Sequence, residues 1–82
     1  MYRILKTSGE VQTGDTITLK EAQGIVKGYV EVIKLPKKKF MLVDEEAKLK
    51  IHPEVNTKAS DLVGMLIYGD VVVLDKMGDL KG

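Results

Sequence analysis

The sequence contains no cysteine and no tryptophan, and it has only two prolines. Without cysteine the chain can form no disulfide, thiolate nucleophile or thiolate metal site, which fits a reducing compartment. No segment approaches the ~20 apolar residues that span a bilayer. Residues 1–6 also lack the apolar stretch and cleavage site of a signal peptide. We therefore expect a cytoplasmic protein without a membrane partner.

Neither sign of charge dominates, because 13 Lys and Arg face 12 Asp and Glu, for a net charge of +1. This balance argues against a strongly basic nucleic-acid binder and against an acidic mimic of nucleic acid. Three Tyr and one Phe offer few platforms on which bases could stack. A chain of this length forms one domain, residues 1–82, and buries only about 60% of its unfolded surface. We expect function on a surface, a shallow groove or a subunit interface.

Short alternating or apolar segments, separated by Gly, Pro and acidic turns, predict about six strands. They are residues 2–7, 10–12, 30–35, 40–43, 48–52 and 66–74. The four consecutive apolar residues 40–43 favour a central strand that is covered on both faces, or covered on one and paired in a dimer on the other. Gly69-Asp70 inside the last strand indicates a bulge or tight turn. Residues 77–82 are expected to fray.

A capping box, Thr18-Leu19-Lys20-Glu21, predicts the start of a first helix over residues 19–27. Its apolar stripe includes Ala22 and Val26 and ends at Tyr29, and Gly28 provides a left-handed stop. Gly24 inside this helix suggests close approach of another backbone.

Asn56 is a suitable N-cap for a second helix over residues 57–63, which Gly64 ends. The predicted order of elements is β-β-α-β-β-β-α-β. The expected fold class is α+β, a mainly antiparallel sheet of about five to six short strands with two short helices on one face.

No group of residues forms a recognisable catalytic constellation. His52 is the only histidine, and it has no nucleophile or ligand at suitable spacing, so a partly exposed structural role is favoured. Asp44, Glu45 and Glu46 are expected in a solvated hairpin turn, and Lys37-Lys38-Lys39 in another. We expect no enzyme activity, no metal site and no cofactor.

Five residues near helix ends and strand starts are candidates for binding: Lys27, Tyr29, Glu31, Asn56 and Lys58. Amides at helix ends favour anions, so this group could hold a small anionic ligand. Tyr29 could equally belong to the core, and Asn56 could act only as a helix cap.

Four short segments in order carry a family resemblance. They are Gly24 to Glu31, Leu42 to Lys50, Pro53 to Ala59, and Leu66 to Leu74. Together they resemble an uncharacterised family of small domains encoded by bacteriophages, plasmids and actinobacterial elements, sometimes beside antirestriction genes. The family pattern is roughly VGGYIE, NEEGKLK, LPxNxxAT and IVGDVVV, and the resemblance covers most of residues 17–74. Departures from it include Lys27 and Ala47, both at positions where the family pattern has glycine.

The resemblance implies a setting in mobile elements and no reaction. Our first hypothesis is a non-enzymatic accessory protein that binds a host or phage protein in the host cytoplasm and counters a defence system. The alternative is a protein that captures a nucleotide-type ligand. A metal-assisted hydrolase built on His52 and the acidic turn is a third, weaker hypothesis. A homodimer is also expected, because residues 66–74 would make a long apolar strand edge.

Overall fold

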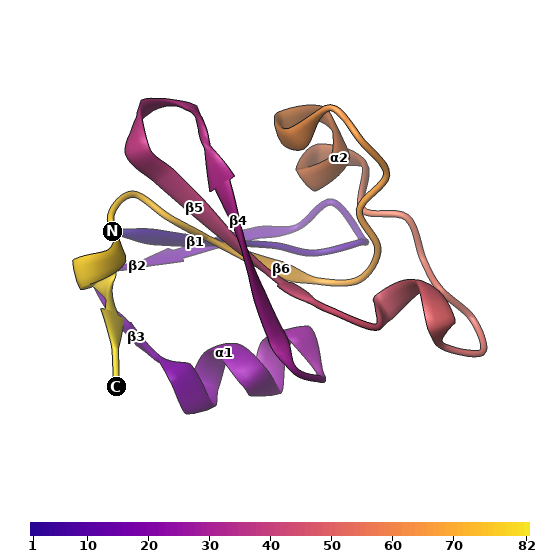
Figure 1. The fold of residues 1–82 in the computed structure, drawn as a ribbon, viewed down its shortest axis with the longest axis horizontal. Helices are drawn as coiled ribbons and strands as arrows, with labels where there is room; N and C mark the ends of the chain where they lie inside the picture. Colours follow the sequence, from indigo (N-terminus) through magenta and orange to yellow (C-terminus); the bar gives the residue numbers. More distant parts are fainter.

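The chain folds around a five-stranded antiparallel sheet, which confirms the expected α+β class (Figure 1). The computed structural model describes residues 1–82. The sheet has the strand order β2-β1-β6-β5-β4, and a short parallel pair, β3 and β7, lies beside it. The strands are β1 (Tyr2–Leu5), β2 (Val11–Gly14), β3 (Ile17–Thr18), β4 (Val30–Leu35), β5 (Lys39–Asp44), β6 (Val71–Leu74) and β7 (Leu80–Lys81). The helices are α1 (Leu19–Val26) and α2 (Thr57–Val63), with 3-10 turns η1 (Pro36–Lys38), η2 (Ala47–Leu49) and η3 (Met77–Asp79).

The sheet is covered on both faces, so its central strands are apolar throughout. All four residues of β6 are buried, as are four of the six in β5. Because side chains alternate between the faces of a strand, these two strands feed two separate clusters. One contains Leu5, Met41, Val43, Ala59, Ile67, Val71 and Val73. The other contains Ile4, Ile17, Ala22, Leu42, Val72 and Leu74.

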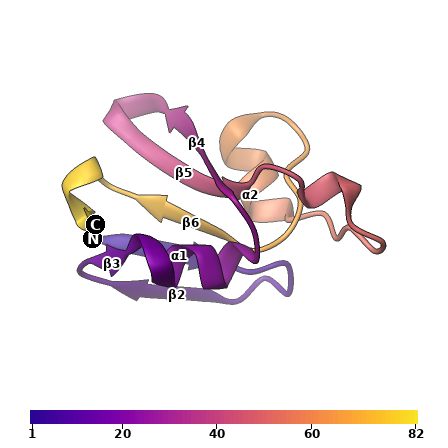
Figure 2. The same ribbon diagram turned by 60° about the horizontal axis from the view of Figure 1, so that its bottom comes forward.

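Each helix covers a different face, which corrects the expectation that both lie on one. Ala22 of α1 belongs to the cluster of Leu42, whereas Ala59 of α2 belongs to that of Met41. Figure 2 shows the two helices on opposite sides of the sheet. The physical reason is the apolar run in β5, which needs cover on both sides and receives one helix for each.

Both helix starts are confirmed at the predicted residues. The Thr18 hydroxyl accepts a hydrogen bond from the Glu21 amide, and the Glu21 carboxylate accepts one from the Thr18 amide, each at 3.0 Å. The hydrogen bonds that the Thr18 amide and hydroxyl donate to the Glu21 carboxylate hold the pKa of Glu21 below its ordinary value. Asn56 caps α2 by accepting from the amide of Ala59 at 3.1 Å, and Gly64 ends that helix in the left-handed region.

The end of α1 differs from the prediction. Lys27, not Gly28, takes the left-handed position, with φ at 62°. Gly28 is needed for a different reason, because a β-carbon there would lie 2.4 Å from Oδ1 of Asp44. Tyr29 is 73% exposed and so does not belong to the core. A β-carbon on Gly24 would meet open space, so that glycine marks no close approach.

The second half of the chain holds fewer strand residues than predicted. Residues 48–52 form no strand and run instead through η2 and a bend. Within residues 66–74 only β6 is a strand, and it lies in the middle of the sheet, so the proposed exposed edge does not exist. Gly69, where a bulge or tight turn was expected, has φ at 80° and lies in a bend just before β6.

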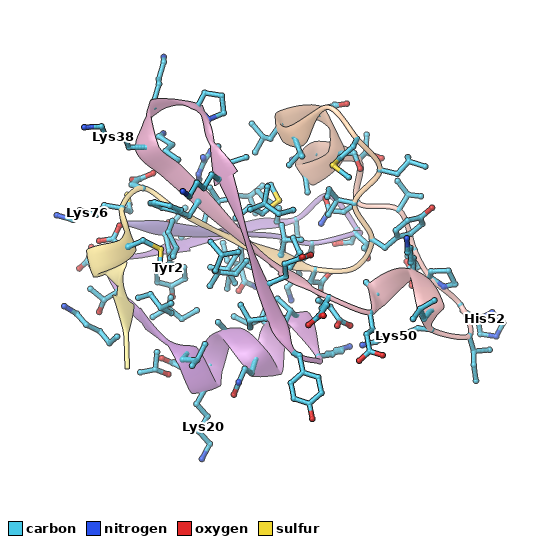
Figure 3. All side chains as sticks on the ribbon, in the orientation of Figure 1. Tyr2, Lys20, Lys38, Lys50, His52 and Lys76 are labelled. Carbon is cyan, nitrogen blue, oxygen red and sulfur yellow. The ribbon has the colours of Figure 1, made fainter.

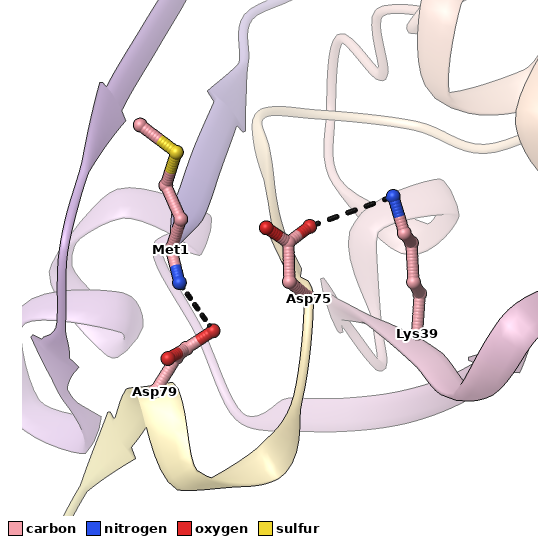
Figure 4. A network of polar contacts seen from close by, with 4 residues as sticks. All are labelled: Met1, Lys39, Asp75 and Asp79. Carbon is pink, nitrogen blue, oxygen red and sulfur yellow. Dashed lines mark hydrogen bonds and ion pairs between the residues drawn. The ribbon is translucent and has the colours of Figure 1, made fainter.

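The C-terminal residues are held in place, not frayed. β7 pairs with β3, and the carboxylate of Asp79 accepts a hydrogen bond from the N-terminal ammonium at 2.6 Å (Figure 4). That bond holds the pKa of Asp79 below its ordinary value. Figure 4 also shows Lys39 and Asp75, whose charged atoms lie 3.6 Å apart. The two ends of the chain therefore meet on one side of the sheet.

Candidate binding surfaces

The five predicted binding residues fall into two separate groups. Lys27, Tyr29 and Glu31 follow one another from the end of α1 into β4, and all three are exposed. Asn56 and Lys58 lie at the start of α2, which covers the sheet face opposite α1, and neither of them lines a hollow with Lys27, Tyr29 or Glu31. The structure therefore does not bring all five into one site.

Asn56 is committed to the fold. It is fully buried, and its amide nitrogen donates to the carbonyl of Leu5 at 2.8 Å and to that of Gly69 at 2.9 Å. Its side-chain oxygen already caps α2. Since both amide protons and the oxygen are engaged, Asn56 has little capacity left for a ligand. Lys58 donates to the carbonyl of Gly9 at 2.8 Å and so ties α2 to the turn between β1 and β2.

Asp44 lies at the end of β5 and organises the loop that follows. Its side chain is only 4% exposed, and Oδ2 lies 2.7 Å from the ammonium of Lys50. Oδ1 accepts from the amide of Glu46 at 3.0 Å, and Lys50 also donates to the carbonyl of Lys27 at 2.6 Å. Asp44 is therefore a buried anchor, which corrects its expected place in a solvated turn. Glu45 and Glu46 are exposed, as expected.

A hollow of about 150 Å³ lies beside this anchor, between the end of α1 and the loops before β6. His52 lines it from an exposed loop position, and Figure 3 shows the His52 and Lys50 side chains on the same side of the molecule. Asp70 also lines the hollow, but its Oδ1 accepts from the amide of Thr7 at 2.9 Å. No three His, Asp or Glu side chains lie close enough together to hold a metal ion. Of the three acidic residues that line this hollow, Asp44 and Asp70 are partnered within the protein, whereas the exposed carboxylate of Glu54 forms no hydrogen bond or ion pair.

The β4 edge is the second candidate surface. β4 is the last strand of the sheet and pairs only with β5. The amide of Glu45 donates to the carbonyl of Tyr29 at 3.0 Å. Since bonded residues alternate along an antiparallel pair, every second residue from Tyr29 onward bonds to β5. The backbone groups that face outward are those of Val30, Val32 and Lys34.

An apolar hollow of about 180 Å³ lies on the α2 side of this edge. Seven of its eleven lining residues are hydrophobic, including Ile33 of β4 and the segment Met65–Ile67. Met65 and Leu66 are 61% and 62% exposed. An open strand edge beside exposed apolar side chains is a common setting for protein recognition.

Comparison with known proteins identifies the family. The model described as a domain of unknown function, DUF3846, matches residues 1–81. The chain belongs to the DUF3846 family. The match extends beyond residues 17–74, the segment over which the motifs are similar. No curated protein and no solved structure matches the chain. Neither helix of this DUF3846 domain is long and apolar enough to cross a membrane.

Sequence reasoning identified β4 but not its place at the edge of the sheet. Strand order depends on contacts between distant segments, which a local pattern does not contain. One signal was available, because residues 30–35 contain the charged residues Glu31 and Lys34, whereas a central strand would be apolar throughout. That difference from the residues of β5 favours an edge position.

Proposed function

We propose that this DUF3846 domain is a non-catalytic binding module that takes a partner protein along the β4 edge. The observation that carries this proposal is the outward-facing backbone of Val30, Val32 and Lys34 next to an apolar hollow. A partner strand added there gains backbone hydrogen bonds from the edge and side-chain contacts from the hollow, which is how strand addition combines affinity with specificity.

The partners of Asp44 and Asp70, which line the hollow of about 150 Å³, also favour binding over catalysis by these two carboxylates. A general acid or base must be free to reach a substrate proton. Asp44 instead holds Lys50 and the amide of Glu46, and Asp70 holds the amide of Thr7. These carboxylates serve the fold.

The biological setting of the proposal rests on the motif resemblance. In that setting the domain acts as an accessory protein of a bacteriophage or other mobile element, in the host cytoplasm, and its partner belongs to a host defence system.

The alternative is a small anionic ligand of nucleotide type. A hollow of about 280 Å³ is lined by Lys27, Tyr29 and Lys50, which supply positive charge and an aromatic ring. Asp44 and Glu46 line the same hollow and offset the two lysines. This balance of charge makes the protein partner the better supported candidate.

The test uses two substitutions at one exposed position of β4. Val32→Pro removes an outward-facing N–H and places a ring on the β4 edge. The hydrogen bonds from β4 to β5 are made by the residues on either side of position 32, so the substitution leaves them in place. Proline is tolerated on edge strands in this orientation. Val32→Ala shortens the same side chain but keeps the N–H. Each tagged protein is incubated with lysate of phage-infected host cells, and retained proteins and small molecules are identified by mass spectrometry.

A host or phage protein that the wild type and Val32→Ala retain, and that Val32→Pro loses, supports the proposal. Circular dichroism must show that Val32→Pro keeps its fold. Retention of the same proteins by all three forms contradicts strand addition at β4. Retention of a nucleotide in place of a protein favours the alternative.

A further inference from the structure

The hairpin between β4 and β5 has an unusual backbone. Lys37 and Lys38 both have positive φ, at 63° and 61°, and the amide of Lys39 donates to the carbonyl of Pro36. Two consecutive left-handed residues are typical of the type I′ turn, where Asn and Gly are preferred. Here two lysines occupy those positions, and the turn holds their side chains at the tip of the hairpin.

The hairpin tip borders a hollow of about 550 Å³, the largest on the molecule. Four lysines lie on its rim, and three apolar side chains line it. The lining residues are Lys34, Leu35, Lys38, Lys39, Phe40, Lys76 and Met77. We call this surface the lysine hollow. Figure 3 shows Lys38 and Lys76 extending from the same side of the molecule, well away from Lys20 on α1.

The lysine hollow carries more positive charge than the chain as a whole. The whole protein has a net charge of +1, yet four of its lysines line this one surface. The nearest carboxylate in an ion pair is that of Asp75, which lies 3.6 Å from the ammonium of Lys39. Lys34, Lys38 and Lys76 form no ion pair in the structure and are exposed. Asp75 offsets part of the charge of Lys39, and the carboxylate of Asp79 interacts with Lys76, but the surface keeps an excess of positive charge. Such a surface attracts a partner of the opposite sign.

We propose that the lysine hollow binds an acidic segment of a protein, with carboxylates against the lysines and an apolar side chain between Phe40 and Met77. The apolar lining distinguishes such a segment from a nucleic-acid backbone, which offers phosphates and sugars and no aliphatic anchor. The hollow contains no arginine, and its one aromatic, Phe40, is half-buried and packs against the core. Stacking on exposed aromatic rings, on which single-stranded nucleic acid depends, is therefore not provided.

This inference deepens the proposed function, since it rests on a protein partner and describes that partner's chemistry. Lys34 and Leu35 belong to β4, so a strand added along the β4 edge would end beside the lysine hollow. The partner sequence expected is an extended, apolar-alternating segment next to a run of Asp or Glu.

The test measures fluorescence anisotropy with a labelled synthetic peptide of glutamates flanking one leucine. One matched peptide has serine in place of leucine, a second has glutamine in place of glutamate, and a labelled single-stranded oligonucleotide carries the same charge as the first. The protein variants are Lys76→Glu and Lys38→Glu, with Lys20→Glu on α1 as a control that changes net charge equally. Circular dichroism checks the fold of each, and Lys76→Gln replaces any charge reversal that unfolds.

We expect the acidic peptide to bind the wild type, more weakly as salt shortens the Debye length. Each reversal in the lysine hollow should weaken binding by roughly fivefold, whereas Lys20→Glu should change it less than about twofold. The peptide with serine in place of leucine should bind the wild-type protein more weakly than the acidic peptide that contains leucine. Equal effects of all three reversals, or an oligonucleotide that binds as tightly as the peptide, would overturn the proposal.

The same experiment separates this inference from the proposed function. Val32→Pro blocks the β4 edge but leaves the lysine hollow intact, so it should still bind the short acidic peptide. A wild-type protein that binds no acidic peptide, yet loses a protein partner on Val32→Pro, would overturn the lysine hollow and leave the β4 edge standing.

Discussion

Lys27 ends α1 in the left-handed region, with φ at 62°. A β-carbon in that region costs roughly 1–2 kcal/mol relative to glycine. The motif pattern that the chain resembles has glycine at this position. The hydrogen bonds of Lys27 are made by its backbone, whose N–H donates to the carbonyl of Gln23 and whose carbonyl accepts from Lys50, so its side chain can be removed without loss of these contacts.

The first prediction is that Lys27→Gly stabilises the domain by about 0.5–1 kcal/mol, after the larger unfolded-state entropy of glycine is counted. The midpoint of urea unfolding should rise. Lys20→Gly, inside the same helix, is the matched control. It should lower the free energy of unfolding by about 1 kcal/mol and so lower the urea midpoint. A lower midpoint for Lys27→Gly would show that its side chain contributes more than the strain costs.

The second prediction compares two glycines four residues apart. At Gly28 a β-carbon would lie 2.4 Å from Oδ1 and 2.7 Å from Cγ of Asp44. Asp44 is buried and paired with Lys50, so it cannot easily move away. Gly28→Ala should destabilise by about 1–3 kcal/mol. Gly24→Ala meets nothing within 4 Å and should stabilise by about 0.5–1 kcal/mol through helix propensity. Thermal melts of both variants test the contrast, and equal shifts would contradict it.

At the scale of elements, the segment after β5 is where a local pattern misled. Residues 48–52 alternate lysine with leucine and isoleucine, as a strand with one buried face would. Leu49 and Ile51 are nevertheless 72% and 89% exposed. β5 already has β4 and β6 as neighbours, so residues 48–52 cannot pair with the strand that precedes them, and they do not pair with the open edge of β4 either. An alternating pattern shows that a segment is able to form a strand, but contacts with distant segments decide whether it joins the sheet.

The third prediction concerns Ala47, the start of η2. Its φ is not positive, and it is buried to 9% exposure. The left-handed geometry that would favour glycine at this turn is therefore absent. Ala47→Gly should destabilise by about 0.5–1 kcal/mol, through added unfolded-state entropy and a lost buried methyl group. A raised urea midpoint would contradict this. Ala59→Gly, buried in α2, is a control that must also destabilise.

At the scale of the whole molecule, local sequence patterns predicted the positions of several helices and strands correctly but did not predict how these elements are arranged in space. Asn56, the Thr18 capping box and β4 (Val30–Leu35) occur at the predicted residues, because caps and turns are made by neighbours in sequence. The strand order, the separation of the helices and the pairing of β7 with β3 depend on distant segments. The candidate residues Lys27, Tyr29 and Glu31 lie just before or at the start of the edge strand β4, a position that the sequence did not indicate.

The last prediction moves the expected homodimer from residues 66–74 to the β4 edge. The outward backbone of β4 is self-complementary: two copies can pair antiparallel about Val32, with Val30 of one opposite Lys34 of the other. Six paired residues bury far less than the ~1,600 Å² of a stable interface, so association should be weak and concentration-dependent. Light scattering should show the 9.1 kDa monomer in dilute solution and a growing fraction of dimer as the protein concentration rises.

Val32→Pro should stay monomeric at every concentration, whereas Val32→Ala should still form the dimer. A wild type that is monomeric at every concentration would remove the dimer while leaving the edge open to a partner. If the dimer forms, it occupies the same backbone groups as that partner, so raising the protein concentration should weaken partner binding.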